Sequence, residues 1–303
     1  MSEGTALEKV TVKAGGERGW PRPSGLLAVW LALSAVACSG EEAEFPKAVA
    51  DGVLQLAELA KDDFKECSGL VASRQFPGVL WTHNDGQDRR LFAIDRRGVK
   101  LAKFELNRVF LWDFEDLAID DQHRLYLADI GNNLEARPHL TVHRVPEPDP
   151  NQANRTLIPE TSWTLKFPGK GFDAEALFVW REYGYLISKS NKDKKGILYR
   201  WPLAGGRSIV LEEIGKLEVK SPITGADLSP DGRKLGLVAT DGAYVIDVTG
   251  PIEAVIKPEA FHLKLKPGQI EGCAFAPDGL LAVAESRELF LFHAPPFIPA
   301  ATD

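Results

Sequence analysis

The sequence has little cysteine or histidine, the residues on which many metal and nucleophilic sites depend. Its 303 residues include 3 cysteines and 6 histidines, and these form no ligand cluster, which excludes a structural zinc site of the common kind. A Gly-x-Ser-x-Gly segment is absent, which excludes a serine hydrolase of the usual α/β type. No linear Asp-x-Asp-x-Asp-Gly calcium loop is present either. Any metal or catalytic site must therefore be assembled from distant parts of the chain.

Positive charge is also scarce, and the basic residues are scattered. The net charge is −7, so we expect no nucleic-acid partner. Without a basic amphipathic face, electrostatic binding to a membrane surface is not expected. The 44% of hydrophobic and 26% of charged residues are ordinary for a globular protein with a true core. The length suits one large domain or two small ones.

Long apolar runs are missing except for one near the N-terminus, "GLLAVWLALSAVA", residues 25–37. It follows a basic stretch and is too short to span a bilayer comfortably, so it predicts an export signal. The residues "LSAVAC" resemble a bacterial lipobox, with Cys38 as the lipidated residue; an ordinary signal peptide cleaved nearby is the alternative. We expect a signal at 1–38, a polar tether at 39–51 and one domain at 52–303.

This reading places the mature protein in the cell envelope, on the periplasmic side of the outer membrane or on the cell surface. We expect a monomer that contacts the membrane only through its lipid anchor. Cys67 and Cys273 would then lie in an oxidising compartment, where a disulfide is possible. We favour two small buried residues instead, because sequence alone does not establish disulfide geometry.

A degenerate repeat fills the remaining sequence. The segments "ECSGLVA", "DFEDLAI", "DAEALFV", "TGADLSP" and "IEGCAF" resemble one another, and short apolar strands and turns follow each of them. Four strands in roughly 40 to 60 residues is the pattern of propeller blades. The alignment gives intervals of 47, 60, 51 and 45 residues between its reference positions, Ser68, Glu115, Glu175, Ala226 and Glu271.

The repeat predicts an all-β fold, a five-bladed β-propeller. The fifth unit ends at "ELFLFHAPPF" with no fourth strand left, and an orphan strand at 52–60 precedes the first motif. Closing the ring with that strand would remove free sheet edges. Six blades, with an eroded unit inside the 60-residue interval, is the alternative. We expect the Pro-rich segment "PEPDPNQANRTLIPETS" there to be a loop, and "IVLEEI" to be the fourth strand of blade three.

Acids recur at the start of the first strand of several blades. The first strand borders the central channel, and the second strand of each blade returns to the same end. We therefore expect the acids of the first strands and the polar residues at the ends of the second strands to meet at one mouth of the channel. The candidate metal ligands are Glu66, Asp113, Glu115, Asp173, Glu175, Gln269 and Glu271. The second strands are expected to bring Asn84, Asp129, Asn132, Asn133, Lys189, Asp241 and Glu285 to the same mouth.

Clustered carboxylates raise one another's pKa, and a hard cation would relieve their repulsion. Oxygen-only ligands suit calcium. The alternative is that these groups bond neighbouring backbone and water. If the site is catalytic, His83 or Asp85 is the candidate base for a metal-bound water.

The five motifs resemble the repeats of the SdiA-regulated family of bacterial envelope β-propellers, and also those of phytase-like esterase-domain propellers, over about residues 52 to 295. The resemblance implies a five- or six-bladed envelope propeller with a divalent cation in its channel. The chain departs from this pattern at Ser68 and Ala226, where no acid stands. It also lacks the dense Lys/Arg array expected around a multiply phosphorylated substrate.

Three functions follow. The first is a binding module for a small molecule, a glycan or an envelope protein. The second is a calcium-dependent phosphoesterase. The third is a scaffold whose polar mouth only holds the blades in register.

Overall fold

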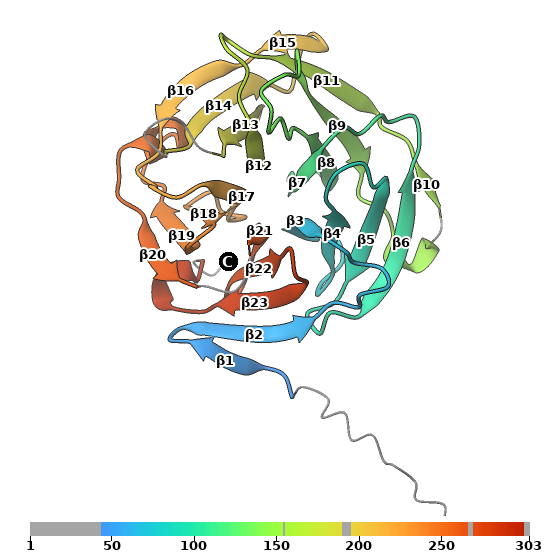
Figure 1. Ribbon diagram of the computed structural model, residues 1–303, viewed down its shortest axis with the longest axis vertical. Coiled ribbons are helices and arrows are strands. Elements are labelled where there is room, and N and C mark those ends of the chain that lie inside the picture. The colour runs from blue at the N-terminus through green and yellow to red at the C-terminus, as the bar shows by residue number, and fades with distance from the viewer. Residues whose placement is uncertain (1–43, 154, 190–194, 266–268, 300–303) are drawn as a thin grey trace, which may run out of the picture. The chain divides into compact units, whose positions relative to one another are not determined.

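The regular sheets of the chain are the blades of one β-propeller. A computed structural model describes residues 44–153, 155–189, 195–265 and 269–299. Within these ranges there is no α-helix, only three short 3₁₀ helices at Pro150–Gln152, Ile252–Ile256 and Pro295–Phe297. Five sheets stand around a common centre (Figure 1), so the five-bladed prediction is confirmed and the six-bladed alternative is wrong. The expected signal segment, with Cys38, lies outside the described residues.

Each blade is an antiparallel meander that runs outward from the channel. Blade one contains β3 (Cys67–Ala72), β4 (Leu80–Asn84), β5 (Arg90–Ile94) and β6 (Lys100–Leu106). Blade two contains β7 (Phe114–Ile119), β8 (Arg124–Asp129), β9 (Leu140–Pro146) and β11 (Thr161–Lys166). Blade three contains β12 (Ala174–Trp180), β13 (Tyr183–Ser188), β14 (Ile197–Pro202) and β16 (Glu212–Lys216).

The last two blades continue the same order. Blade four contains β17 (Ile223–Leu228), β18 (Lys234–Ala239), β19 (Gly242–Asp247) and β20 (Phe261–Lys264). Blade five contains β21 (Ile270–Ala276), β22 (Gly279–Ala284) and β23 (Glu288–Phe292), and then the N-terminal strands β2 (Val53–Glu58) and β1 (Lys47–Ala50).

Burial explains the different sequence patterns of inner and outer strands. Every residue of β7, β17 and β21 is buried, because neighbouring blades cover both faces of an inner strand. In β6 the burial instead alternates along much of the strand, because one face of this outer strand meets water. Large side chains fill the space between blades; Trp163 of blade two, for example, meets Trp201 of blade three edge-on at 6.4 Å between ring centroids.

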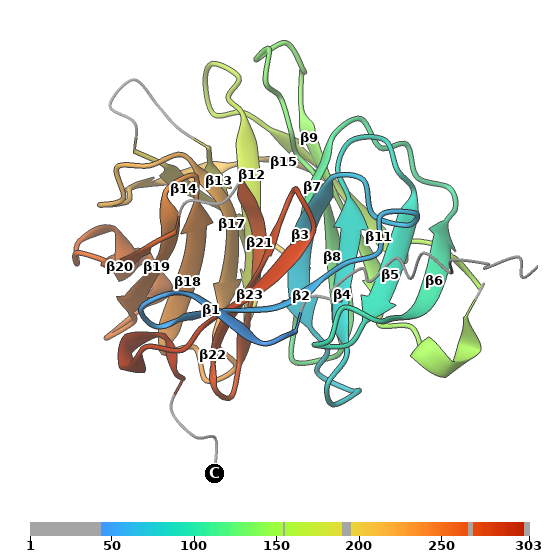
Figure 2. The same ribbon diagram turned by 60° about the horizontal axis from the view of Figure 1, so that its bottom comes forward.

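The N-terminal strand closes the ring as expected. Strand β2 pairs antiparallel with β23, with Leu54 opposite Leu291, and so becomes the fourth strand of blade five. Residues 47–50, which we expected to belong to the tether, form β1 and pair with β2. The turn between them contains Asp51 and Gly52, and Gly52 has a φ of 71°, a conformation that glycine adopts without strain. Figure 2 shows β1 and β2 crossing in front of β23.

Two short strands outside the meanders were missed by sequence reasoning. The Pro-rich segment is not only a loop, because β10 (Thr156–Leu157) pairs parallel to β6 of blade one. The segment "IVLEEI" is divided: β15 (Ser208–Val210) pairs parallel to β11 of blade two, and only its second half enters β16. Both additions cover the outer edge of a preceding blade, where unpaired backbone groups would otherwise be exposed.

Removing β2 should destabilise the protein far more than removing β1. Val53 and Ala57 of β2 are buried in the core, whereas all four residues of β1 are exposed. We expect a chain that begins at Leu59 to melt on the order of 10 °C lower and to self-associate through the bare edge of β23. A chain that begins at Asp51 should melt within about 2 °C of the parent. Thermal denaturation and light scattering test this, and equal melting temperatures would contradict it.

Candidate functional site

The second residue of each inner strand lies at the same end of the channel. In four of these strands the pairing with the next strand skips this residue, and in β3 it skips the following one, so a β-bulge stands at this level in every blade. A β-bulge changes the direction in which the side chain of its extra residue points. All five side chains at this level are buried: Ser68, Glu115, Glu175, Thr224 and Glu271.

The alignment of blade four was therefore wrong by two residues. The structure puts Thr224, not Ala226, in register with Glu271. The segments "TGADLSPDG" and "EGCAFAPDG" show the signal that would have given this alignment, because both have seven residues from the reference position to the turn aspartate. Degenerate motifs allow such slips, since in blade four no acid stands at the reference position to fix the alignment.

Two positions of this ring have a structural role. The Ser68 hydroxyl donates a 2.6 Å hydrogen bond to the Glu115 carbonyl, and the Thr224 hydroxyl donates to the Ile270 carbonyl. Each bond joins one inner strand to the inner strand of a neighbouring blade. In these two blades the polar side chain holds neighbouring blades together, as the scaffold alternative expects. The acids of the other three blades need a separate explanation.

Those acids line a polar cavity of about 230 Å³ at the mouth of the channel. Among the described residues its wall contains five carboxylates and one cationic side chain, Lys189. The lining residues are Cys67, Ser68, Asp85, Glu115, Asn133, Glu175, Lys189, Gln269, Glu271 and Glu285. They come from blades one, two, three and five, so the predicted convergence of distant residues occurs.

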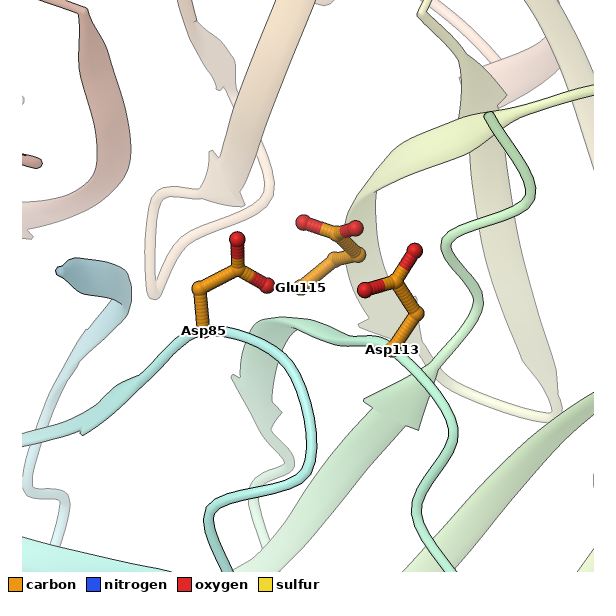
Figure 3. Close-up of side chains that lie close together, drawn as sticks. All are labelled: Asp85, Asp113 and Glu115. Carbon is orange, nitrogen blue, oxygen red and sulfur yellow. The ribbon is translucent and has the colours of Figure 1, made fainter. Parts of the chain in front are cut away.

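Three carboxylates meet most closely on one side of this mouth. Asp85, Asp113 and Glu115 each place an oxygen within 4.8 Å of the other two (Figure 3). Burial, and then the charges of Asp85 and Glu175, raise the pKa of Glu115 well above its usual range. Burial and Asp113 likewise raise the pKa of Asp85 to about 6. Oxygens at this spacing can share one cation, whose charge would favour the ionised carboxylates and so oppose both shifts.

The other two glutamates are partly satisfied within the protein. Glu175 forms an ion pair with Lys189, yet burial still raises the pKa of Glu175 to about 8. Gln269 donates a 2.9 Å hydrogen bond to Glu271, where burial raises the pKa to about 7. Within the part of the chain that the structure describes, one lysine and one amide do not balance the five carboxylates of the cavity.

One carboxylate oxygen of the cavity is buried without a partner among the described residues. Glu175 is 3% exposed, and its Oε2 atom accepts no hydrogen bond from them. Glu115, on the same cavity wall, is also buried at 6% exposed. A buried carboxylate oxygen without a donor is costly, so Glu175 Oε2 is suited to a ligand that supplies positive charge.

The remaining candidate ligands lie at the rim of the cavity. Glu66 is exposed, and its carbonyl accepts a hydrogen bond from the Asp85 backbone at 2.8 Å. Asp173 accepts a 2.7 Å bond from the Asn132 backbone N–H, so its carboxylate is already engaged. Both acids add negative charge near the mouth, and neither lines the cavity itself.

His83 is not exposed at the mouth. Its ring is fully buried, stacks on Phe114 at 3.5 Å between centroids, and bonds through Nδ1 to the Asn84 carbonyl. Burial lowers the pKa of His83 to about 4, so the ring is neutral at pH 7. Asp85, the other candidate base, belongs to the carboxylate cluster, whose spacing would suit a metal ion.

Most of the polar residues at the ends of the second strands hold loops rather than face the cavity. Asn84 bonds the backbone of Lys65 and Asp63, and Asn132 accepts from the Arg137 backbone. Asp129 pairs with Arg137, while Asp241 accepts from the Tyr244 hydroxyl. Of that predicted set, the cavity wall contains Asn133, Lys189 and Glu285.

Sequence reasoning missed Asp116, which is completely buried one residue after the acid ring. Its carboxylate accepts backbone hydrogen bonds from Leu117 and Leu177 at 2.8 Å and from Ala226 at 3.4 Å, and so ties three inner strands together. Burial raises the pKa of Asp116 well above its usual range. The aligned repeats contain a signal for Asp116. At the same position the other four blades have only small residues: Gly69, Ala176, Gly225 and Gly272.

The two cysteines of the domain are buried and free, as favoured, and do not form a disulfide. Among the described residues no helix is long and apolar enough to cross a membrane.

No protein-family model matches the sequence, and no curated protein does. Similar solved structures include a PQQ-bound aldose sugar dehydrogenase from Streptomyces coelicolor, with 13% identity, a TM-score of 0.47, and coverage of 79% of this chain and 96% of that one. A nidogen/laminin complex has 10% identity, a TM-score of 0.46 and 73% coverage of each chain. Virginiamycin B lyase from Staphylococcus aureus has 12% identity, a TM-score of 0.41, and covers 74% and 64%. At these identities the likeness is one of fold alone.

Without a bound cation, the protein should lose stability as pH rises from about 5 to 8. The carboxyls have folded-state pKa values above the ordinary glutamate value of 4.5, so their contribution is complete below that value. It is lost as pH rises through the folded pKa values, about 7 for Glu271 and about 8 for Glu175. We expect the Tm in EDTA to fall over this range, and to fall less in Glu271→Gln. Equally steep profiles in thermal denaturation would contradict this origin.

Replacing Asp116 should weaken the fold without affecting the mouth. Asp116→Asn keeps only one carbonyl oxygen for three backbone donors, so we expect a loss of about 1–3 kcal/mol in the free energy of unfolding. Asp121→Asn is the matched control, because Asp121 is exposed in the turn of the same blade and should change stability by less than about 0.5 kcal/mol. Urea denaturation of both variants provides the comparison. Equal stabilities would show that Asp116 does not hold the inner strands.

Proposed function

We propose that this protein is a lipid-anchored, extracytoplasmic binding module whose channel mouth holds a divalent cation, with calcium as the best candidate. The observation that carries the proposal is the approach of Asp85, Asp113 and Glu115 to within 4.8 Å of one another, beside the buried Glu175 Oε2 atom that has no partner among the described residues. Carboxylate and amide oxygens are the ligands that calcium accepts in flexible numbers. Glu175 and Glu271 lie in the same cavity and add ligands or charge around the ion.

The cellular setting rests on the sequence. The basic stretch, the apolar run and Cys38 support export and lipidation, and the motif resemblance supports membership of the SdiA-regulated or phytase-like envelope propellers. In that setting a propeller would present its acidic mouth to a soluble ligand or an envelope partner. No nucleic acid fits a mouth with this charge.

The calcium-dependent phosphoesterase is the less supported alternative. A hydrolase needs a base within reach of a metal-bound water. His83 is buried against Phe114, and Asp85 is used in the carboxylate cluster, so neither is placed as a free base. Cation-assisted binding needs only the ligands that the cavity contains.

Calcium should raise the melting temperature, and EDTA should reverse the effect. A ligand that binds only the folded state stabilises it by about 2.7 kcal/mol at one hundred times its dissociation constant. We expect Glu115→Gln to lose the calcium-induced shift and to remain folded, since the amide is isosteric. Asp121→Asn, on the opposite side of blade two, should retain the full shift. An unchanged Tm with calcium in the parent protein would refute a calcium site.

The same samples separate binding from hydrolysis. Incubation with p-nitrophenyl phosphate and calcium should release no more nitrophenol from the parent than from Glu115→Gln. Release that requires both calcium and Glu115 would instead establish the phosphoesterase.

A further inference from the structure

Two large aromatic side chains are exposed beside the acidic mouth. Phe110 is 73% exposed and Trp112 is 55% exposed, and both belong to the segment that joins β6 to β7. Their ring centroids lie 6.3 Å apart in an edge-to-face arrangement. Trp112 directly precedes Asp113, one of the three clustered carboxylates. The aromatic pair is therefore continuous in the chain with the candidate cation site.

This segment is held by a buried network rather than left as a loose loop. Asp129 Oδ1 accepts hydrogen bonds from the backbone N–H groups of both Trp112 and Asp113, each at 2.8 Å. Asp129 in turn forms a 2.8 Å ion pair with Arg137, and both side chains are buried. An exposed tryptophan on a backbone positioned in this way is pre-organised for contact, which lowers the entropic cost of binding.

Arg137 links the exposed ring to the carboxylates. Its guanidinium carbon lies 5.7 Å from the centroid of the Trp112 ring, and its Nη1 donates a 2.7 Å bond to the Gly131 carbonyl. Gly131 packs against the acids so closely that a Cβ atom there would overlap Glu115 Oε1 and Asp113 Oδ2. The ring, the guanidinium and the carboxylates thus form one connected unit.

The charges around this unit select the kind of ligand. The carboxylates of the mouth repel an anion. Arg137 already occupies the neighbourhood of the Trp112 ring, so this ring is a poor place for a second cation. A neutral molecule that has one flat apolar face and a rim of oxygen ligands satisfies both surfaces. A pyranose sugar has this combination, with axial C–H groups on a face and hydroxyls at its edge.

We propose that Trp112, together with Phe110, is a stacking platform for a neutral oligosaccharide whose hydroxyls reach the cation site. The proposal rests on the cation binding put forward above. Adjacent hydroxyl oxygens would complete the coordination of calcium, which accepts six to eight oxygen ligands. The exposed amide of Asn133, on the cavity wall, is placed to bond a further hydroxyl. Leu134, next to it and 89% exposed, extends the apolar rim.

Isothermal titration with cellotetraose, chitotetraose and mannotetraose, each in calcium and in EDTA, tests this assignment. We expect at least one to bind in calcium and to bind at least about tenfold more weakly in Trp112→Ala, the size of loss typical of a central aromatic contact. Phe261→Ala is the control, because Phe261 is a 44% exposed aromatic on β20 in blade four and should leave the affinity unchanged. Phe110→Ala is a second variant if Trp112→Ala does not fold.

The calcium-induced Tm shift, measured on the same proteins, separates this inference from the proposed function. A shift retained in Trp112→Ala with sugar binding lost supports the platform. A normal shift in the parent with no binding of any of the three sugars overturns the platform and leaves cation binding intact. Sugar binding that is equal in calcium and EDTA overturns the link to the cation. Binding of the apolar dye ANS to this rim, without sugar binding, would also overturn the assignment and indicate a protein partner.

Discussion

The close approach of five inner strands to one axis is the constraint on which the structure depends. At Gly225 and Gly272 a Cβ atom would overlap the backbone of the neighbouring inner strand, so only glycine fits there. Asp116 occupies the same level and uses its carboxylate to join the strands of blades two, three and four. Because the strands meet this tightly, the residues one position earlier are brought together at one end of the channel, where most of them line the cavity.

The ring concentrates like charge. Three of its five positions are glutamates, and Asp85 and Asp113 join them from adjacent loops. Burial removes water that would otherwise screen these acids, so their pKa values rise, while Lys189 and Gln269 compensate only part of the charge. A fold that needed only structural contacts could use hydroxyls at every position, as it does at Ser68 and Thr224. The acids at the other three positions are the reason for proposing a use beyond holding the blades together.

The residues beside the acidic cavity make this face a candidate recognition surface. The Asp129–Arg137 pair supports the backbone of Trp112 and Asp113 together, so an apolar ring and a metal-ligand candidate share one support. The opposite ends of the strands carry plain turns, such as the one that contains Asp121, and no comparable meeting of acids is found there in the described chain. The candidate functional site therefore lies on one face of the propeller.

The sequence by itself favoured five blades over six, and it determined the ring closure by residues 52–60 and the end of the channel at which Glu115, Glu175 and Glu271 meet. These features follow from the spacing of the repeats and from the direction of the strands within each blade, and the same pattern occurs in five repeats. Only the tertiary structure decided the register of Thr224, the parallel strands β10 and β15, the burial of His83 and the central place of Asp116. These depend on contacts between blades, where the partner of a residue lies some 40 to 110 positions away and leaves no mark on the neighbouring sequence.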